Sequence, residues 1–256
     1  MRFLAALLAA MLSFVAPTLA YADPSQAALD QVSLLGRQLA AYDASAAAAM
    51  DAVLALKPDK DKMGLYLGEV GNDGWTFFFG RLNAANNAFL ISYEAKQNGD
   101  HFVASAFTLP AEDSGDLASL ARAVVAAKAD FGTASHPQAQ YNIAAIVQPD
   151  DSIFVYVYPA QTSNDVLVYG ADWRYQYSAD GRTLIERRQL HRTLLQNPIY
   201  ANMAAIVHTD VLSDIPVETD VFWSLLRRIP TYVSAGGWTF GIASDGSIKI
   251  ISQIPK

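Results

Sequence analysis

Residues 153–158 read Ile-Phe-Val-Tyr-Val-Tyr, a run of β-branched and aromatic side chains that predicts a β-strand. Other strand-like runs occur along most of the chain. We expect them at 63–70, 75–79, 88–93, 102–109, 141–147, 166–169, 173–177, 184–188, 203–207, 231–233, 238–242 and 247–251. These runs come in clusters and do not alternate regularly with helices, so an α+β fold is favoured over a parallel α/β sheet.

Four dipeptides between these runs favour tight turns: Asp73-Gly74, Asn98-Gly99, Asp180-Gly181 and Asp245-Gly246. Each pair tolerates the positive φ angles that two-residue hairpin loops require. Because each pair separates two strand-like runs, we predict four β-hairpins. The predicted fold class is therefore α+β, with a mainly antiparallel, hairpin-rich sheet and about three main helices.

The first predicted helix follows Ser25, which can cap its N-terminus. Apolar side chains then recur every three or four residues through residue 42, as expected for one buried helical face. The pattern resumes beyond Asp43-Ala44-Ser45 and stops at Lys57-Pro58, because the residue before a proline is disfavoured in a helix. Either one kinked helix or two helices fit this stretch.

Two further helices are expected later in the chain. The second begins near Asp113-Ser114, and Gly132 is a plausible C-cap. The third begins around residues 214–216 and ends before Pro230, with two arginines in its last turn, where cations suit the helix dipole.

A short internal repeat and a change of composition suggest a division of the chain. Gly74-Trp75-Thr76-Phe77 recurs at residues 237–240. This repeat either marks two related modules or reflects two unrelated strands that begin with the same residues. Gly, Thr, Ser, His and Pro in the segment 132–138 separate two patterned regions. We therefore expect an N-terminal region over 23–132 and a C-terminal region over 138–256, which could also pack together as one domain.

The first 22 residues read as a secretory signal peptide. Arg2 forms a short positive region, residues 3–15 are apolar, and Ala20-Tyr21-Ala22 is a cleavage motif. The apolar stretch is shorter than the roughly 20 residues of a membrane span, which argues against a retained anchor. We expect a periplasmic or extracellular location, with no stable membrane span after cleavage.

The composition excludes several classes of protein. With 18 Lys and Arg against 25 Asp and Glu, the net charge is -7, which argues against a nucleic-acid partner. The chain has no cysteine, so disulfides, thiolate catalysis and cysteine-ligated metals are excluded. Nucleophile-elbow, phosphate-loop and dinucleotide-binding motifs are missing from the sequence. The expected partner is an unidentified protein or small molecule.

The segment from 205 to 222 is the most suggestive for chemistry. An apolar strand leads to His208 and Asp210, whose side chains share one face because strand residues alternate. Asp220 follows ten residues after Asp210, in the first turns of a predicted helix. One imidazole and two carboxylates that converge in this way could bind a divalent metal ion, zinc included.

This segment resembles the JAB/MPN-type metalloproteases over residues 200–250. That family has a strand ending in H-x-H, a loop of about ten residues, and S-x-x-D opening a helix; His208 matches the first histidine and Asp220 the aspartate. Asp210 stands at the second histidine position and Val217 at the serine position. The resemblance implies a degenerate domain of this fold or a zinc-dependent hydrolase, with an upstream glutamate such as Glu69 as the general base.

The same residues also have purely structural interpretations. Asp214 can cap the third helix, Asp210 can accept from loop amides, and His208 can donate at the strand end. None of these roles needs a ligand.

A second candidate segment, residues 173–195, holds the only basic cluster, which includes Arg174 and His191. Arg174 interleaves with Tyr175 and Tyr177, an arrangement that could bind an anionic or carbohydrate ligand. The alternative is a hairpin with a solvated face. The stretch is also similar to one in uncharacterised secreted proteins of Gram-negative bacteria, which supports the location but no activity.

Two functions therefore remain in view. The first is a secreted, non-catalytic binding or interaction module. The second is a metal-dependent hydrolase of peptide or isopeptide bonds that uses His208, Asp210 and Asp220 as metal ligands and Glu69 as the base.

Overall fold

The computed structural model describes residues 24–255 as an α+β protein. These residues contain three α-helices, one 3-10 helix at Lys60–Lys62 and fourteen strands, so the predicted fold class is confirmed. The predicted signal peptide at residues 1–22 lies outside the described residues. Among the described residues, no helix is both long enough and apolar enough to span a membrane.

The first sheet is an antiparallel meander in the order β1-β2-β3-β4. Turns at Asp73-Gly74 and at Gly99 join its outer pairs of strands, and both glycines have positive φ, of 107° and 64°. Two of the four predicted hairpins are thereby confirmed. The strands are β1 (Leu65–Gly71), β2 (Gly74–Leu82), β3 (Phe89–Asn98) and β4 (His101–Asp113).

The second sheet is also antiparallel, in the order β5-β6-β8-β9. Its last two strands are joined by the predicted turn at Asp180-Gly181. The intervening strand β7 leaves this sheet and pairs with β10. The strands are β5 (Tyr141–Val147), β6 (Ile153–Pro159), β7 (Val166–Gly170), β8 (Trp173–Tyr177), β9 (Leu184–Gln189) and β10 (Leu194–Pro198).

The third sheet has the order β11-β12-β13-β14 and contains the one parallel pair among the described strands, β11 with β12. The fourth predicted turn, at Asp245-Gly246, joins β13 to β14. The two copies of Gly-Trp-Thr-Phe open β2 and β13, each the second strand of a hairpin. The strands are β11 (Ile206–Thr209), β12 (Thr231–Ala235), β13 (Trp238–Ile242) and β14 (Ile248–Gln253).

The three predicted helices are present with shifted ends. Helix α1 (Gln26–Ala55) is one continuous helix capped by Ser25, which resolves the choice between one helix and two. Helix α2 (Asp116–Thr133) includes Gly132, so this glycine is helical and is not the predicted C-cap. Helix α3 (Glu218–Arg227) is capped by Val217 instead of Asp214.

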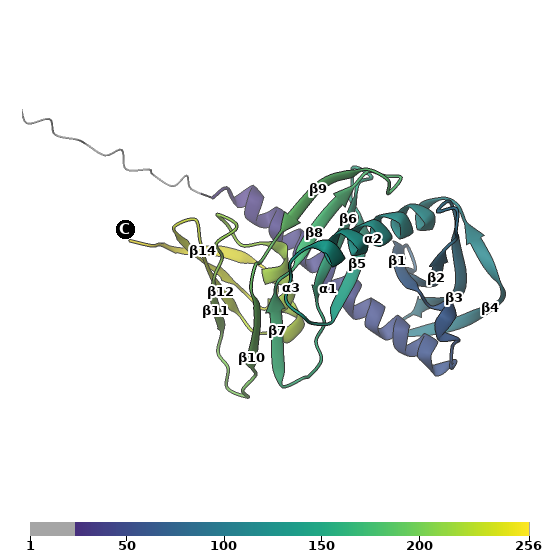
Figure 1. Ribbon diagram of the computed structural model, residues 1–256. Helices are drawn as coiled ribbons and strands as arrows, with labels where there is room; N and C mark the ends of the chain where they lie inside the picture. Colours follow the sequence, from purple (N-terminus) through teal and green to yellow (C-terminus); the bar gives the residue numbers. More distant parts are fainter. Residues whose placement is uncertain (1–23, 256) are drawn as a thin grey trace, which may run out of the picture.

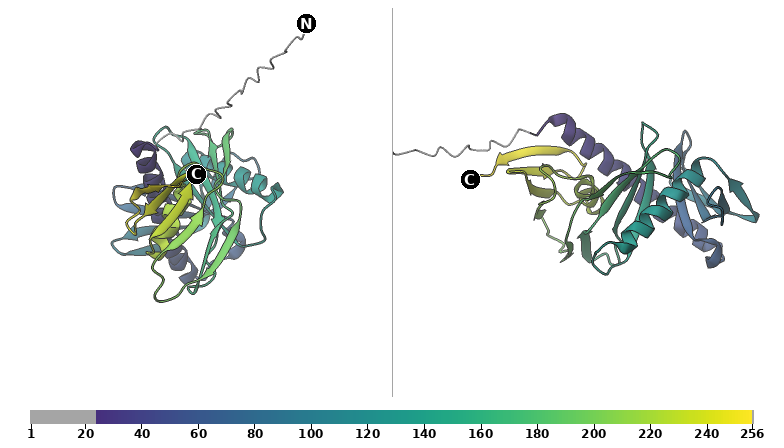
Figure 2. Two further views of the ribbon diagram at one scale, coloured as in Figure 1. Left: turned by 90° about the vertical axis from the view of Figure 1, so that its left-hand side faces the viewer. Right: turned by 45° about the horizontal axis from the view of Figure 1, so that its top comes forward.

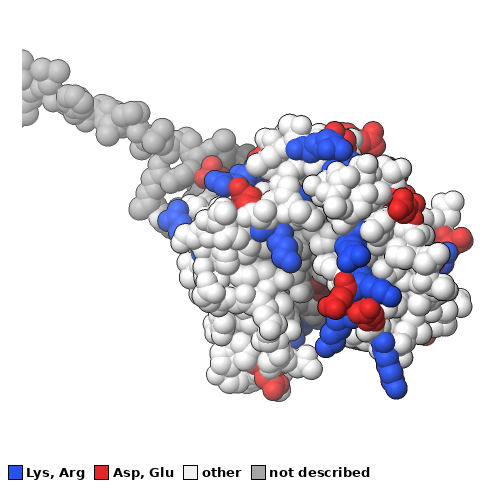
Figure 3. Space-filling view, turned by 45° about the vertical axis from the view of Figure 1, so that its right-hand side comes forward, with Lys and Arg blue, Asp and Glu red and all other residues white. Residues whose placement is uncertain are grey.

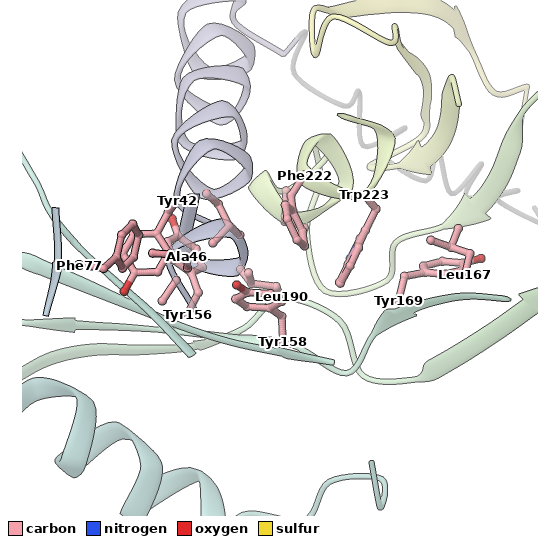
Figure 4. Close-up of a cluster of buried hydrophobic side chains, with 14 of the residues drawn as sticks. Tyr42, Ala46, Phe77, Tyr156, Tyr158, Leu167, Tyr169, Leu190, Phe222 and Trp223 are labelled. Carbon is pink, nitrogen blue, oxygen red and sulfur yellow. The ribbon is translucent and has the colours of Figure 1, made fainter. Parts of the chain in front are cut away.

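The run at 153–158 now forms most of β6, and its alternation explains how the layers are built. Val155 and Val157 face the core beneath α2, whereas Tyr156 and Tyr158 face the core that contains α1 (Figure 4). Both faces of β6 are therefore buried. A strand that is covered on both sides has no solvent-facing side chains, so polar and apolar residues do not alternate along it. This accounts for the continuous apolar sequence of β6.

The core crosses the predicted division of the chain. The cluster around α1 joins Tyr42 and Phe77 from the N-terminal region to Tyr158, Leu190 and Phe222 from the C-terminal region (Figure 4). In the elongated molecule, the first and third sheets lie at opposite ends, and α1 runs past the second sheet between them (Figures 1 and 2). The segment 132–138 is a connection between α2 and β5 and does not separate the cores.

Replacement of Gly36 by alanine is expected to destabilise the protein by about 1–3 kcal/mol, because α1 and α3 pack closely there. A methyl group at Gly36 would lie 2.6 Å from the carbonyl oxygen of Glu218 and would also meet Val221. Gly132→Ala in α2 is the matched control, since no atom lies within 4 Å of its new methyl group. Alanine there should stabilise the helix by about 0.5–1 kcal/mol. Urea denaturation measures the free energy of unfolding of both variants. Equal effects of Gly36→Ala and Gly132→Ala would contradict the close contact between α1 and α3.

Candidate metal site

A cluster of two histidines and one aspartate forms where four segments of the C-terminal half meet. His208 lies in β11, Asp220 in the first turn of α3, and His191 in the loop after β9. One ligand atom from each of these three residues can be chosen so that all lie within 4.8 Å of one another. Asp172, in the short link between β7 and β8, lies directly behind His191.

The carboxylate of Asp220 is the centre of the cluster and is almost completely buried. Its Oδ1 atom is 2.8 Å from Nε2 of His208 and 3.1 Å from Nε2 of His191. Its Oδ2 atom accepts a hydrogen bond from the backbone N–H of Val217 at 2.8 Å, which ties the carboxylate to the start of α3. Both oxygens are therefore fixed by the local fold.

His191 is held between two carboxylates. Its Nδ1 lies 2.8 Å from Oδ1 of Asp172 and its Nε2 faces Asp220, so both ring nitrogens can donate. Burial alone would lower the pKa of His191, but the charges of Asp172 and Asp220 outweigh it and raise this pKa well above the ordinary value. For Asp220 the two effects have the opposite signs. Burial alone would raise the pKa of its carboxyl, but the charges and hydrogen bonds of His191 and His208 outweigh burial and lower this pKa.

The geometry of the cluster suits a tetrahedral metal ion. Zinc binds imidazole nitrogen and carboxylate oxygen at about 2.0–2.2 Å, so neighbouring ligand atoms stand about 3.3 Å apart. The two nitrogen–oxygen distances to Asp220, 2.8 Å and 3.1 Å, are shorter than this by about 0.2–0.5 Å. Small rotations of the side chains would admit the ion. A metal-binding histidine is usually oriented by a carboxylate on its other nitrogen, which is the position of Asp172.

A small cavity of about 70 Å³ adjoins the cluster, and His191, His208 and Asp210 line it. Oδ1 of Asp210 accepts from the backbone N–H of Leu212, as the structural interpretation expected. Its Oδ2 is buried and has no partner among the described residues. Burial raises the pKa of Asp210, and the hydrogen bond from the Leu212 amide and the charge of His191 oppose this rise only in part. Asp210 thus lines the cavity, but it is not among the residues whose ligand atoms converge.

His191 and Asp172 were missed by sequence reasoning. The predicted ligand set was His208, Asp210 and Asp220; the structure brings His208 and Asp220 together and adds His191 as the second imidazole. A backbone hydrogen bond brings His191 and Asp172 together. The N–H of Leu190 donates to the carbonyl of Asp172 at 2.9 Å, so the loop after β9 lies beside the link between β7 and β8. The only available signal was the scarcity of histidine, of which the chain has 4.

The structure places Glu69 away from this cluster. It lies in β1 and lines a different cavity, together with Asp116 of α2, whereas the small cavity beside His208 is lined by other residues. A role for Glu69 as a base acting beside His208 therefore has no support in the geometry.

Arg174, Tyr175 and Tyr177 do not form an exposed ligand platform. Tyr175 and Tyr177 are buried in the core beneath α2. Arg174 is also buried, on the other face of β8, where its guanidinium donates to Glu218 and Glu186 at 2.7 Å each. On the face seen in Figure 3, basic side chains lie interspersed with acidic ones.

The remaining histidines lie outside the cluster. His101 is exposed at the start of β4, and His136 stacks on Phe131 with the ring centroids 4.0 Å apart.

Comparison with known proteins adds no relative. No family model matches the chain, and neither a curated protein nor a solved structure shows significant similarity to it.

Proposed function

We propose that this chain is a secreted, non-catalytic metal-binding module that holds one zinc ion between His191, His208 and Asp220. The observation that carries the proposal is the convergence of these three ligand atoms within 4.8 Å, with Asp172 orienting His191 from behind. Such a carboxylate–histidine pair is typical of metal centres. The signal-peptide pattern at residues 1–22 supports a periplasmic or extracellular location.

The charge of the cluster also favours a divalent cation. Three buried carboxylates, those of Asp172, Asp210 and Asp220, lie around the imidazoles of His191 and His208. Buried charges are tolerated when they are paired or when they coordinate a metal. A zinc ion would give the carboxylates a second positive partner and would take the place of a proton on His191.

The size of the adjoining cavity favours binding over peptide hydrolysis. Pockets that take organic ligands usually measure about 300–1,000 Å³, whereas this cavity measures about 70 Å³. It can admit a water molecule or one small side-chain atom group, but not an extended peptide. The site is thus suited to hold an ion, either to stabilise the C-terminal fold or to receive one ligand from a partner protein.

Metal content tests this proposal. We expect about one zinc per chain after residues 23–256 are purified without a histidine tag and dialysed against trace zinc. His208→Gln keeps a donor near Asp220 but loses the imidazole, so it should bind less than a tenth as much zinc at the same free concentration. His101→Ala is the control, because it removes an exposed imidazole elsewhere. Equal zinc in all three proteins, or none in any, would refute the site.

A metal-dependent hydrolase is the second candidate, and the unpartnered Oδ2 of Asp210 beside the cluster is the observation in its favour. This oxygen could act as the general base that the JAB/MPN resemblance assigns to a glutamate. Zinc would supply Lewis acidity to such a site. Zinc-dependent cleavage of a fluorogenic peptide that is abolished in Asp210→Asn would establish this function, and its absence would leave the binding role.

A further inference from the structure

A second cavity, of about 500 Å³, lies between the edges of the first and second sheets. Strand β1 pairs only with β2, and β5 pairs only with β6, so each presents an unpaired edge. The cavity is lined by residues 68–70 of β1 and 145–147 of β5. Its volume falls in the range of pockets that bind small organic molecules.

The charged side chains that line this cavity are all acidic. Glu69, Asp116 and Asp151 line it, and no Lys, Arg or His does. Among the described residues, no salt bridge reaches any of the three. Burial, together with the charges of Asp116 and Asp113, raises the pKa of Glu69. A positively charged ligand would relieve this repulsion.

The inner wall is apolar and aromatic and carries one polar atom without a partner. Trp75, Leu120 and Ile146 contribute apolar surface. Tyr42, which is 1% exposed, reaches the cavity from α1, and its hydroxyl has no hydrogen-bond partner among the described residues. Burial raises the pKa of Tyr42, and the nearby backbone amides of Ala145 and Gly68 oppose only part of this rise without meeting hydrogen-bond geometry. A buried hydroxyl without a partner is costly and points to a ligand atom.

We propose that this cavity binds a small organic ammonium ion with an apolar body. The ammonium group pairs with Glu69 and Asp116, and the apolar body lies against Trp75 and Leu120. A polar group at the far end meets the hydroxyl of Tyr42. The cavity beside the proposed zinc site is lined by different residues, so ammonium binding here does not depend on zinc binding there.

Calorimetric titration of the full chain without zinc tests the charge selectivity. Tyramine carries an ammonium, a phenyl ring and a distal hydroxyl, and two analogues change only its charged end: tyrosol is neutral and 4-hydroxyphenylacetate is anionic. We expect tyramine to bind, tyrosol to bind at least about tenfold more weakly, and the anion not to bind. Equal binding of the three compounds, or no binding of tyramine, would overturn the proposal.

Three variants locate the binding site. Glu69→Gln removes the half-buried charge and should weaken tyramine binding about tenfold. Tyr42→Phe removes a hydroxyl that has no protein partner, so the fold should be retained while tyramine binds several-fold more weakly. Asp51→Asn on the exposed face of α1 removes one charge remote from the cavity lining and should leave binding unchanged. Equal weakening by Asp51→Asn and Glu69→Gln would show only general charge attraction and would refute the site.

Discussion

Zinc is expected to stabilise the folded chain by about 4 kcal/mol when the free ion is about 1,000-fold above its dissociation constant. The proposed ligands His191, His208 and Asp220 come from the loop after β9, from β11 and from α3, which converge only in the folded protein. An unfolded chain cannot offer this set, so the binding free energy appears as a shift in unfolding. Thermal denaturation with zinc and with a chelator measures it.

This stabilisation should increase with pH. Because the pKa of His191 is raised in the folded protein, its imidazolium stabilises the metal-free fold below the unfolded pKa of about 6.5. That contribution is lost as the pH rises through the raised value. Zinc must displace the proton from His191, so the apparent affinity should rise about tenfold per pH unit while this residue remains protonated in the metal-free protein.

Asp172→Asn separates the role of His191 from general effects of charge. The amide can still meet Nδ1 of His191 but no longer supplies a negative charge, so the imidazolium should be less favoured. We expect weaker zinc binding, by about 10–100-fold, and a flatter dependence on pH. Asp165→Asn, in the exposed loop between β6 and β7, is the control. A zinc affinity independent of pH in the wild-type protein would contradict a proton-linked imidazole ligand.

The fold could be predicted from local signals because the turns and strands are encoded locally. The four Asx-Gly turns demand positive φ at glycine, and each joins antiparallel neighbours as expected. The helix ends were less predictable. Asp214 was the better N-cap by residue type, but Asp220 instead reaches back to the amide of Val217, and this contact moves the start of α3.

The site could be predicted only in part because it depends on long-range contacts. His208 and Asp220 lie twelve residues apart, and the strand–loop–helix pattern between them was enough to suggest that they meet. His191 and Asp172 approach them through the pairing of separate strands, which no local pattern encodes. Arg174 was interpreted as a surface residue because alternation in β8 gives its face but not what covers that face.

Arg174 carries the second large effect, because it neutralises a carboxylate in the interior. Its Nη1 donates to Oε1 of Glu218 at 2.7 Å, and the Glu218 side chain is only 2% exposed. The guanidinium also lies 4.5 Å from the centroid of the Phe154 ring. The hydroxyl of Tyr156, 3.4 Å from the same Oε1 atom, is the other contact of that carboxylate oxygen. Loss of Arg174 would leave Glu218 charged at the start of α3 with a single weak hydrogen bond.

Arg174→Met is therefore expected to destabilise the protein by about 3–5 kcal/mol, the usual cost of removing one partner of a buried ion pair. Arg187→Met is the matched control: its bridge to Asp130 at 3.2 Å is half-exposed, so its loss should cost no more than about 1 kcal/mol. In the double variant Arg174→Met/Glu218→Gln no buried uncompensated charge remains, because Glu186, the other partner of Arg174, is half-exposed, and most of the stability should return. Urea denaturation of the wild type, the two single variants and the double variant measures these changes in the free energy of unfolding. If the double variant were no more stable than Arg174→Met, the loss would come from packing around Phe154 instead of from the buried charge of Glu218.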